Sequence, residues 1–310
     1  MVNILYTLTR NLEFGIWNLH GYAVAMRRVI LGIIFYLLAI VIVSAVLTPV
    51  AHWATSAAGW GFPVRRVFNR TLMVGAMLLL VPLMFWWRIN WRRCGVTVSG
   101  WGKILPWLVV GAATIAVLYA GQAVAGVAEW SPRLEWWQPL MFLLVALIVS
   151  VLEEIMFRGV MFCAWISEHQ WRTLAVAVVG SAFFATAHFI KAQNPAGEVT
   201  WLTGWQIWAE MGGHFLVWRE LAMRWLTLFW TGMMLCAVTW RTGAIWAAVG
   251  LHAGWVLALK VSGRLVATHP DSGSLWFAAD ALEGLWPALL LLVMFLIQIA
   301  KRKSPNQLIR

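Results

Sequence analysis

The sequence predicts an all-α integral membrane protein, a bundle of about eight transmembrane helices, from its composition and from the spacing of its apolar stretches. Of the 310 residues, 62% are hydrophobic and 11% are charged, whereas soluble domains carry roughly 25% charged residues. A soluble globule of this composition would have too few polar residues to cover its surface. An extramembrane enzyme, a disordered chain and a disulfide scaffold are therefore excluded.

Eight stretches reach or approach the ~20 apolar residues that a helix needs to cross a bilayer. They cover residues 29–49, 71–87, 104–128, 139–166, 173–190, 223–239, 242–261 and 284–300. No internal repeat divides them, so we expect a single membrane domain over residues 1–310. The head before the first stretch is too long for the n-region of a secretory signal, which indicates an uncleaved anchor.

Basic residues gather between the apolar stretches and give the chain a net charge of +11. Snorkelling side chains and contact with anionic lipid head groups explain short runs such as Arg27-Arg28 and Arg92-Arg93, so no nucleic-acid partner is expected. Their distribution favours a multi-pass protein of the cell membrane, the cytoplasmic membrane in a prokaryote, with both termini in the cytoplasm. The first outer loop, with Arg65, Arg66 and Arg70, departs from that rule.

The stretch 199–222 differs from the apolar spans. Trp201, Trp205 and Trp208 recur at i, i+4 and i+7 before Gly212-Gly213 interrupts the pattern. This spacing indicates a helix lying in the membrane interface, where tryptophan is enriched. Two interpretations stay open at this point: a loop anchored by aromatic residues, or a gate that flanks a functional site.

The fourth span contains three charged residues, Glu153, Glu154 and Arg158. An ionisable side chain at the centre of a transmembrane helix costs about 3 kcal/mol on insertion scales, so such residues usually carry a function. Neighbouring residues of a helix point ~100° apart, and the two glutamates therefore have different roles. Glu154 and Arg158 are spaced to pair along one face, which leaves Glu153 as the unpaired charge.

Histidines occur in two other spans. Phe184 and His188 share a helix face at the end of the fifth span, and His252 lies near the centre of the seventh. A carboxylate and two imidazoles converging from three helices can activate a water molecule and stabilise an oxyanion. At 1.5 Å per residue, His188 would lie ~10 Å from the bilayer mid-plane, so we expect the fifth helix to shift or to extend toward Ala192.

Three short motifs follow one another along the chain and resemble those of the CAAX protease and bacteriocin-processing family, also called the CPBP or Abi family. They are Glu153-Glu154-x-x-x-Arg158, then Phe184-x-x-x-His188, then His252. The resemblance covers about residues 139–262, which we expect to form the catalytic core. Members of this family are glutamate-dependent intramembrane endopeptidases that cleave a peptide bond in or near the bilayer.

The resemblance implies a role for each of these residues. Glu153 would activate the catalytic water with the help of His188. Glu154 would support the site together with Arg158. His252 would contribute to an oxyanion hole, and no metal or other cofactor would be required. The expected partners are the lipid bilayer and a membrane-associated peptide or protein substrate.

One position departs from the family pattern and keeps alternatives open. The third motif usually closes with Asn or Asp four residues after its histidine, but this chain has Val256, which cannot donate a hydrogen bond. A non-proteolytic scaffold or immunity protein is therefore one alternative. A zinc-dependent hydrolase is another, because glutamate and histidine are zinc ligands.

Overall fold

The computed structural model describes residues 2–87, 89, 91–92, 95–162, 170–189, 192–193, 195, 197–214, 218–269 and 274–300, with side chains except at 2–26, 28–29, 170–172 and 212–221. The chain divides into two compact units. The first comprises residues 1–88 and 192–208, and the second comprises residues 89–191 and 209–310. Each unit is described by itself below.

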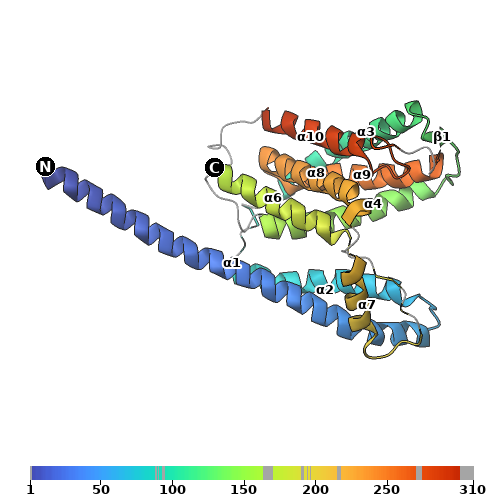
Figure 1. Cartoon of the computed structure of the whole chain (residues 1–310), viewed down its shortest axis with the longest axis horizontal. Coiled ribbons are helices and arrows are strands. Elements are labelled where there is room, and N and C mark those ends of the chain that lie inside the picture. The colour runs from blue at the N-terminus through green and yellow to red at the C-terminus, as the bar shows by residue number, and fades with distance from the viewer. Residues whose placement is uncertain are drawn as a thin grey trace. The chain divides into compact units, whose positions relative to one another are not determined.

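The first unit consists of two long helices, α1 (Val2–Ala57) and α2 (Val64–Trp87) (Figure 1). It also contains the first half of α7 (Thr203–His214). Two hydrogen bonds tie α1 to α2: the Tyr36 hydroxyl donates to the Ala76 carbonyl at 2.9 Å, and the Thr48 and Thr71 hydroxyls lie 2.9 Å apart. The Trp208 indole of α7 donates to the Ser44 hydroxyl of α1 at 3.0 Å. The predicted aromatic stretch thus contains a helix over its central part, and its role as a gate stays a prediction.

The second unit is a helical bundle arranged around α9 (Ile245–Leu265). Against α9 pack α3 (Ile104–Val124), α4 (Gln138–Glu154) and α8 (Trp218–Thr242), while α6 (Gln170–Ala187) and α10 (Leu285–Ala300) pack on α8 (Figure 1). Every residue from Ile245 to Trp255 except the half-buried Trp246 is buried. His252 therefore lies in the centre of this bundle.

Small residues allow α3 and α9 to approach closely. A Cβ atom built on Gly250 or Gly254 of α9 would collide with the backbone carbonyl of Ile104 or Leu108 in α3, and one on Gly111 of α3 would collide with the carbonyl of Leu251. Two glycines four residues apart form the small-xxx-small pattern that brings transmembrane helices together. This contact sets the position of α9, and with it the position of His252.

We expect Gly254→Ala to destabilise the protein by about 1–3 kcal/mol, the usual cost of overpacking a well-packed interior. Gly263→Ala in the same helix is the matched control, because a Cβ atom there meets no other atom within 4 Å. The control should be neutral or slightly stabilising, since alanine favours helix more than glycine does. Thermal unfolding of both variants in the same detergent measures the difference, and equal melting temperatures would contradict the close contact.

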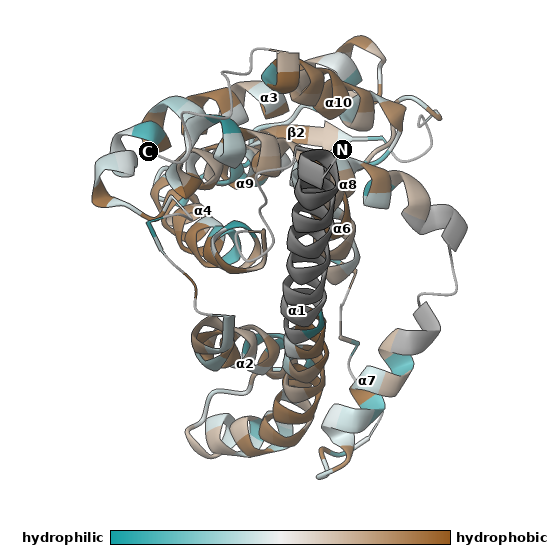
Figure 2. Cartoon of the chain, turned by 90° about the vertical axis from the view of Figure 1, so that its left-hand side faces the viewer, coloured by the Kyte–Doolittle hydropathy of each residue, from teal (hydrophilic) through white to brown (hydrophobic). Residues whose placement is uncertain are grey.

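The predicted all-α membrane class is confirmed. Five helices in the described part of the chain are long and apolar enough to cross a membrane: Ile30–Ala57, Val64–Trp87, Val98–Val124, Gln138–Phe162 and Ile245–Leu265. Two shorter apolar helices, Thr173–Ala187 and Leu285–Ala300, correspond to the fifth and eighth predicted stretches. Hydrophobic residues make up most of α3 and α4 (Figure 2), and several of them are exposed, such as Leu105 in α3 and Leu140 in α4. The expected count of eight spans is not confirmed, because α8 contains the predicted stretch 223–239 but is not among the five.

Three local features were not predicted. The six-residue 3₁₀-helix η1 (Val98–Lys103) precedes α3. Strands β1 (Ala128–Trp130) and β2 (Val266–Thr268) form a small antiparallel ribbon after α3 and α9. The fourth span is α-helical only to Glu154 and continues as the π-helix η2 (Ile155–Phe162). The wider π turn therefore begins at the residue after the glutamate pair.

Candidate active site

The two neighbouring glutamates occupy different environments at the end of α4. Glu154 is fully buried, whereas the Glu153 side chain is 28% exposed. The side chains of Glu153 and Glu154 therefore point in different directions, as predicted from the sequence. The change to π-helix directly after them is notable because π turns frequently occur at functional sites.

Glu154 and Arg158 form the predicted ion pair, with 3.1 Å between Arg158 Nη1 and Glu154 Oε1. The second guanidinium nitrogen, Nη2, donates to the Gly232 carbonyl of α8 at 3.2 Å. The Arg158 guanidinium also lies over the Phe184 ring, 4.7 Å from its centroid. The charge of Arg158 is thus balanced inside the bundle, and its side chain links η2 to α6 and α8.

His252 is held by Glu154, a contact that the sequence did not indicate. Its Nδ1 lies 2.9 Å from Glu154 Oε1, the same oxygen that accepts from Arg158. The His252 ring is almost fully buried, and its other nitrogen, Nε2, lies 3.9 Å from Glu153 Oε2. Glu154 therefore orients His252 of α9 toward Glu153, the partly exposed glutamate of α4.

His188 reaches the site from the end of α6. The helix ends at Ala187, so the expected extension toward Ala192 is wrong, and His188 lies in the turn that follows. The backbone N–H of His188 bonds to the Ala185 carbonyl instead of to the Phe184 carbonyl. The Phe184 carbonyl, one of the last groups without a helical partner, instead accepts from His188 Nδ1 at 2.8 Å. This turn brings the imidazole to the glutamates without a longer helix.

Glu153 lies between the two histidines. Its Oε2 is 3.9 Å from His188 Nε2 and 3.9 Å from His252 Nε2. Both distances exceed a direct hydrogen bond, and at such separations one water molecule can bridge two polar atoms. Oε2 is buried and accepts no hydrogen bond from any described protein group. The structure therefore brings Glu153, His188 and His252 together as the sequence predicted.

Phe184 lies where these groups meet. Its ring centroid is 4.4 Å from that of His188, 6.2 Å from that of His252 and 5.1 Å from that of Phe157 in η2. The ring is fully buried. Phe184 thus positions His188 through its carbonyl and packs against both imidazoles through its side chain. Phe157 was not singled out from the sequence, where nothing distinguishes it from other apolar residues of the span.

Val256 lies one turn after His252 in α9 and is partly buried. It supplies no polar group to the site, so the departure from the family pattern stands. In the described part of the chain, no three His, Cys, Asp or Glu side chains are arranged to hold a metal ion. Cys236 of α8 is a buried free thiol.

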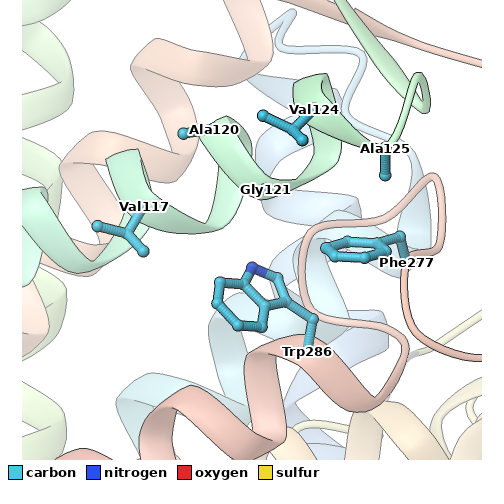
Figure 3. A pocket seen from close by; sticks show the side chains of 7 residues that line it. All are labelled: Val117, Ala120, Gly121, Val124, Ala125, Phe277 and Trp286. Atoms are coloured by element: carbon cyan, nitrogen blue, oxygen red, sulfur yellow. The ribbon is translucent and has the colours of Figure 1, made fainter.

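A separate hollow of about 440 Å³ opens between the end of α3 and the start of α10. Val117, Gly121, Val124, Phe277 and Trp286 line it, and Figure 3 shows the Phe277 and Trp286 rings beside the backbone of Gly121. Its lining contains no acidic residue and no histidine. The hollow is therefore no part of the glutamate–histidine cluster.

Comparison with known proteins gives a match to a protein family. Residues 135–258 match the family described as Type II CAAX prenyl endopeptidase Rce1-like, and this segment contains all six residues of the three motifs, together with Val256. No curated protein and no solved structure gives a significant match. The resemblance inferred from the motifs is confirmed: residues 135–258 of this multi-pass membrane protein match the Rce1-like family of CAAX proteases.

Proposed function

We propose that the protein is an intramembrane endopeptidase in which Glu153 and His188 activate a water molecule and His252 stabilises the oxyanion. The observation that carries this proposal is the position of Glu153 Oε2, 3.9 Å from the Nε2 atoms of both histidines. A water oxygen between Glu153 and His188 would lie within hydrogen-bond reach of both, as general-base catalysis requires.

The reaction is hydrolysis of a peptide bond. The water oxygen bonds to the carbonyl carbon of the substrate while its proton passes to Glu153. The carbonyl oxygen takes up the negative charge and accepts a hydrogen bond from His252. The C–N bond then breaks, the leaving nitrogen takes the proton from Glu153, and a carboxylic acid and an amine are released.

The proposed substrate is a membrane-associated peptide or protein. Prenylated CAAX tails are the first class to test because of the family match; bacteriocin leaders, sorting-signal tails and peptide pheromones are the others. The full chain, reconstituted in lipid nanodiscs, is incubated with a farnesylated CAAX peptide and with the same peptide without its lipid. Mass spectrometry then identifies the products. Cleavage of the farnesylated peptide alone assigns the class, and cleavage of neither directs the search to the other classes.

Zinc-dependent hydrolysis is the second candidate, because Glu153, His188 and His252 are all possible ligands. We expect EDTA or phenanthroline to leave turnover essentially unchanged, since the proposed mechanism needs only a carboxylate and an imidazole around one water. Metal analysis of the purified protein accompanies the assay. Stoichiometric zinc, with activity lost on chelation and restored by adding zinc back, would establish the metal mechanism instead.

A further inference from the structure

Glu154 is the acidic partner of the buried Arg158. Arg158 remains protonated in proteins and its guanidinium has donors only. The side chain is 1% exposed, and its Nη1 donates to Glu154 Oε1 at 3.1 Å. A buried guanidinium without a counter-charge is strongly destabilising. Glu154 Oε1 therefore acts as the acceptor of a charged pair.

The protonation of His252 Nδ1 follows from this. Oε1 of Glu154 is an acceptor, so Nδ1, which lies 2.9 Å from it, is the donor. Nε2 is then the ring nitrogen left to act at the site, and it faces Glu153. Because a neutral imidazole carries one N–H only, Nε2 can donate to an oxyanion only when both ring nitrogens are protonated.

Four charged groups would then alternate in sign across the site. Glu153 is negative, His252 positive, Glu154 negative and Arg158 positive, with 3.9, 2.9 and 3.1 Å between the contacting atoms. The row sums to zero, whereas a neutral His252 would leave it with a charge of −1. Alternation of this kind places each charge next to its opposite in a low-dielectric interior.

The other ionisable groups near His252 fit this arrangement. His188 of α6 donates Nδ1–H to the neutral carbonyl of Phe184, so its Nε2 offers a lone pair to the water. Cys236 of α8 contributes a buried thiol near Arg158. The α3 helix, which packs along α9, has no charged side chain between Ile104 and Val124. Lys103, before α3, donates to the Thr242 carbonyl at 2.7 Å.

We infer that Glu154 is the positioning residue for His252 and holds it as a doubly protonated donor, whose charge replaces the side-chain donor missing at Val256. This inference rests on the proposed function, in which His252 serves the oxyanion. The arrangement parallels that of a catalytic triad, in which a buried carboxylate orients an imidazole and stabilises its charged form. Hydrogen bonds from charged donors are roughly twice as strong as neutral ones, so one charged donor can serve in place of two neutral donors.

The first measurement needs no activity. In full-length protein labelled with ¹⁵N-histidine and reconstituted in nanodiscs, nitrogen NMR at pH 7 reports how many ring nitrogens of each histidine are protonated. The His252→Gln variant identifies the His252 signals. We expect two protonated nitrogens on His252 in the wild type and one in Glu154→Gln. A singly protonated His252 in the wild type would overturn the inference and leave the role of Glu153 intact.

The second measurement uses turnover. Glu154→Gln keeps an acceptor for Nδ1–H but removes the charge, so kcat should fall about 10²–10³-fold, the usual effect of losing one oxyanion donor, with little change in KM. Glu154→Asp keeps the charge and should recover part of the rate. A Glu154→Gln enzyme with wild-type kcat contradicts the inference.

Val256→Asn tests the compensation directly. If charge on His252 replaces the missing donor, the new amide should raise kcat by a larger factor in the Glu154→Gln background than in the wild type. Equal factors in the two backgrounds would contradict the compensation. Glu154→Gln leaves Arg158 buried without a charged partner. The comparison of Val256→Asn in the two backgrounds is therefore repeated with Glu154→Gln/Arg158→Met, which removes both charges of the pair. Glu153→Gln tests the proposed function by itself: retained turnover in this variant contradicts the proposed function, whereas the nitrogen spectrum of His252 in the wild type decides this inference.

Discussion

Glu153→Gln is expected to lower turnover by about 10²–10⁴-fold while the protein inserts, purifies and melts like the wild type. The substitution preserves the size of the side chain and removes the base, and general acid–base catalysis contributes a factor of this order. Stability should change little, because Glu153 is 28% exposed and its Oε2 accepts no hydrogen bond from the described protein groups. Turnover on one peptide and the melting temperature are measured on the same preparation.

Glu129→Gln is the control for that variant. Glu129 lies in β1, is 62% exposed and lies 3.6 Å from His269 of the same end of the bundle, outside the cluster of Glu153, His188 and His252. It should keep wild-type turnover. If Glu153→Gln retains most of its activity, Glu153 is not the base.

Arg158→Ala is expected to destabilise the protein by about 3–5 kcal/mol, because it leaves Glu154 buried without its charge partner. It also removes the hydrogen bond to the Gly232 carbonyl and the contact with the Phe184 ring. Turnover should fall as well, since the carboxylate that holds His252 loses its anchor. Thermal unfolding and turnover in the same detergent measure the two effects.

Arg224→Ala provides the comparison. Arg224 also pairs with a carboxylate, Asp280, at 2.9 Å, but its side chain is 28% exposed. Exposed ion pairs contribute about 0–1 kcal/mol, so this variant should melt close to the wild type and remain active. Equal losses of stability in the two variants would show that burial of the Glu154–Arg158 pair has no special importance.

The membrane class and the members of the site were predictable from the sequence because a bilayer makes charge expensive. Glu153, Glu154, His188 and His252 stood out as polar residues in apolar spans, and the structure brings them together. The i, i+4 spacing of Glu154 and Arg158 also predicted their contact, which survives the change from α4 to the π-helix.

Other features depend on contacts that residue spacing does not encode. The Glu154–His252 hydrogen bond joins residues 98 positions apart, and its geometry follows from the close approach of helices in the bundle. The end of α6 at Ala187 depends on a side chain capturing the Phe184 carbonyl, which hydropathy does not register. The Gly232 carbonyl that binds Arg158 is a backbone group, so no residue type marks it.

The central claim is that Glu153 makes the protein an endopeptidase, and protein termini in the membrane test it most directly. Membrane fractions from cells producing the wild-type protein and from cells producing equal amounts of Glu153→Gln are compared by mass spectrometry of N- and C-terminal peptides. We expect at least one new terminus that appears only with the wild type and that carries ¹⁸O when cleavage proceeds in ¹⁸O-labelled water. Identical termini in the two fractions, with both proteins folded and inserted, would contradict it.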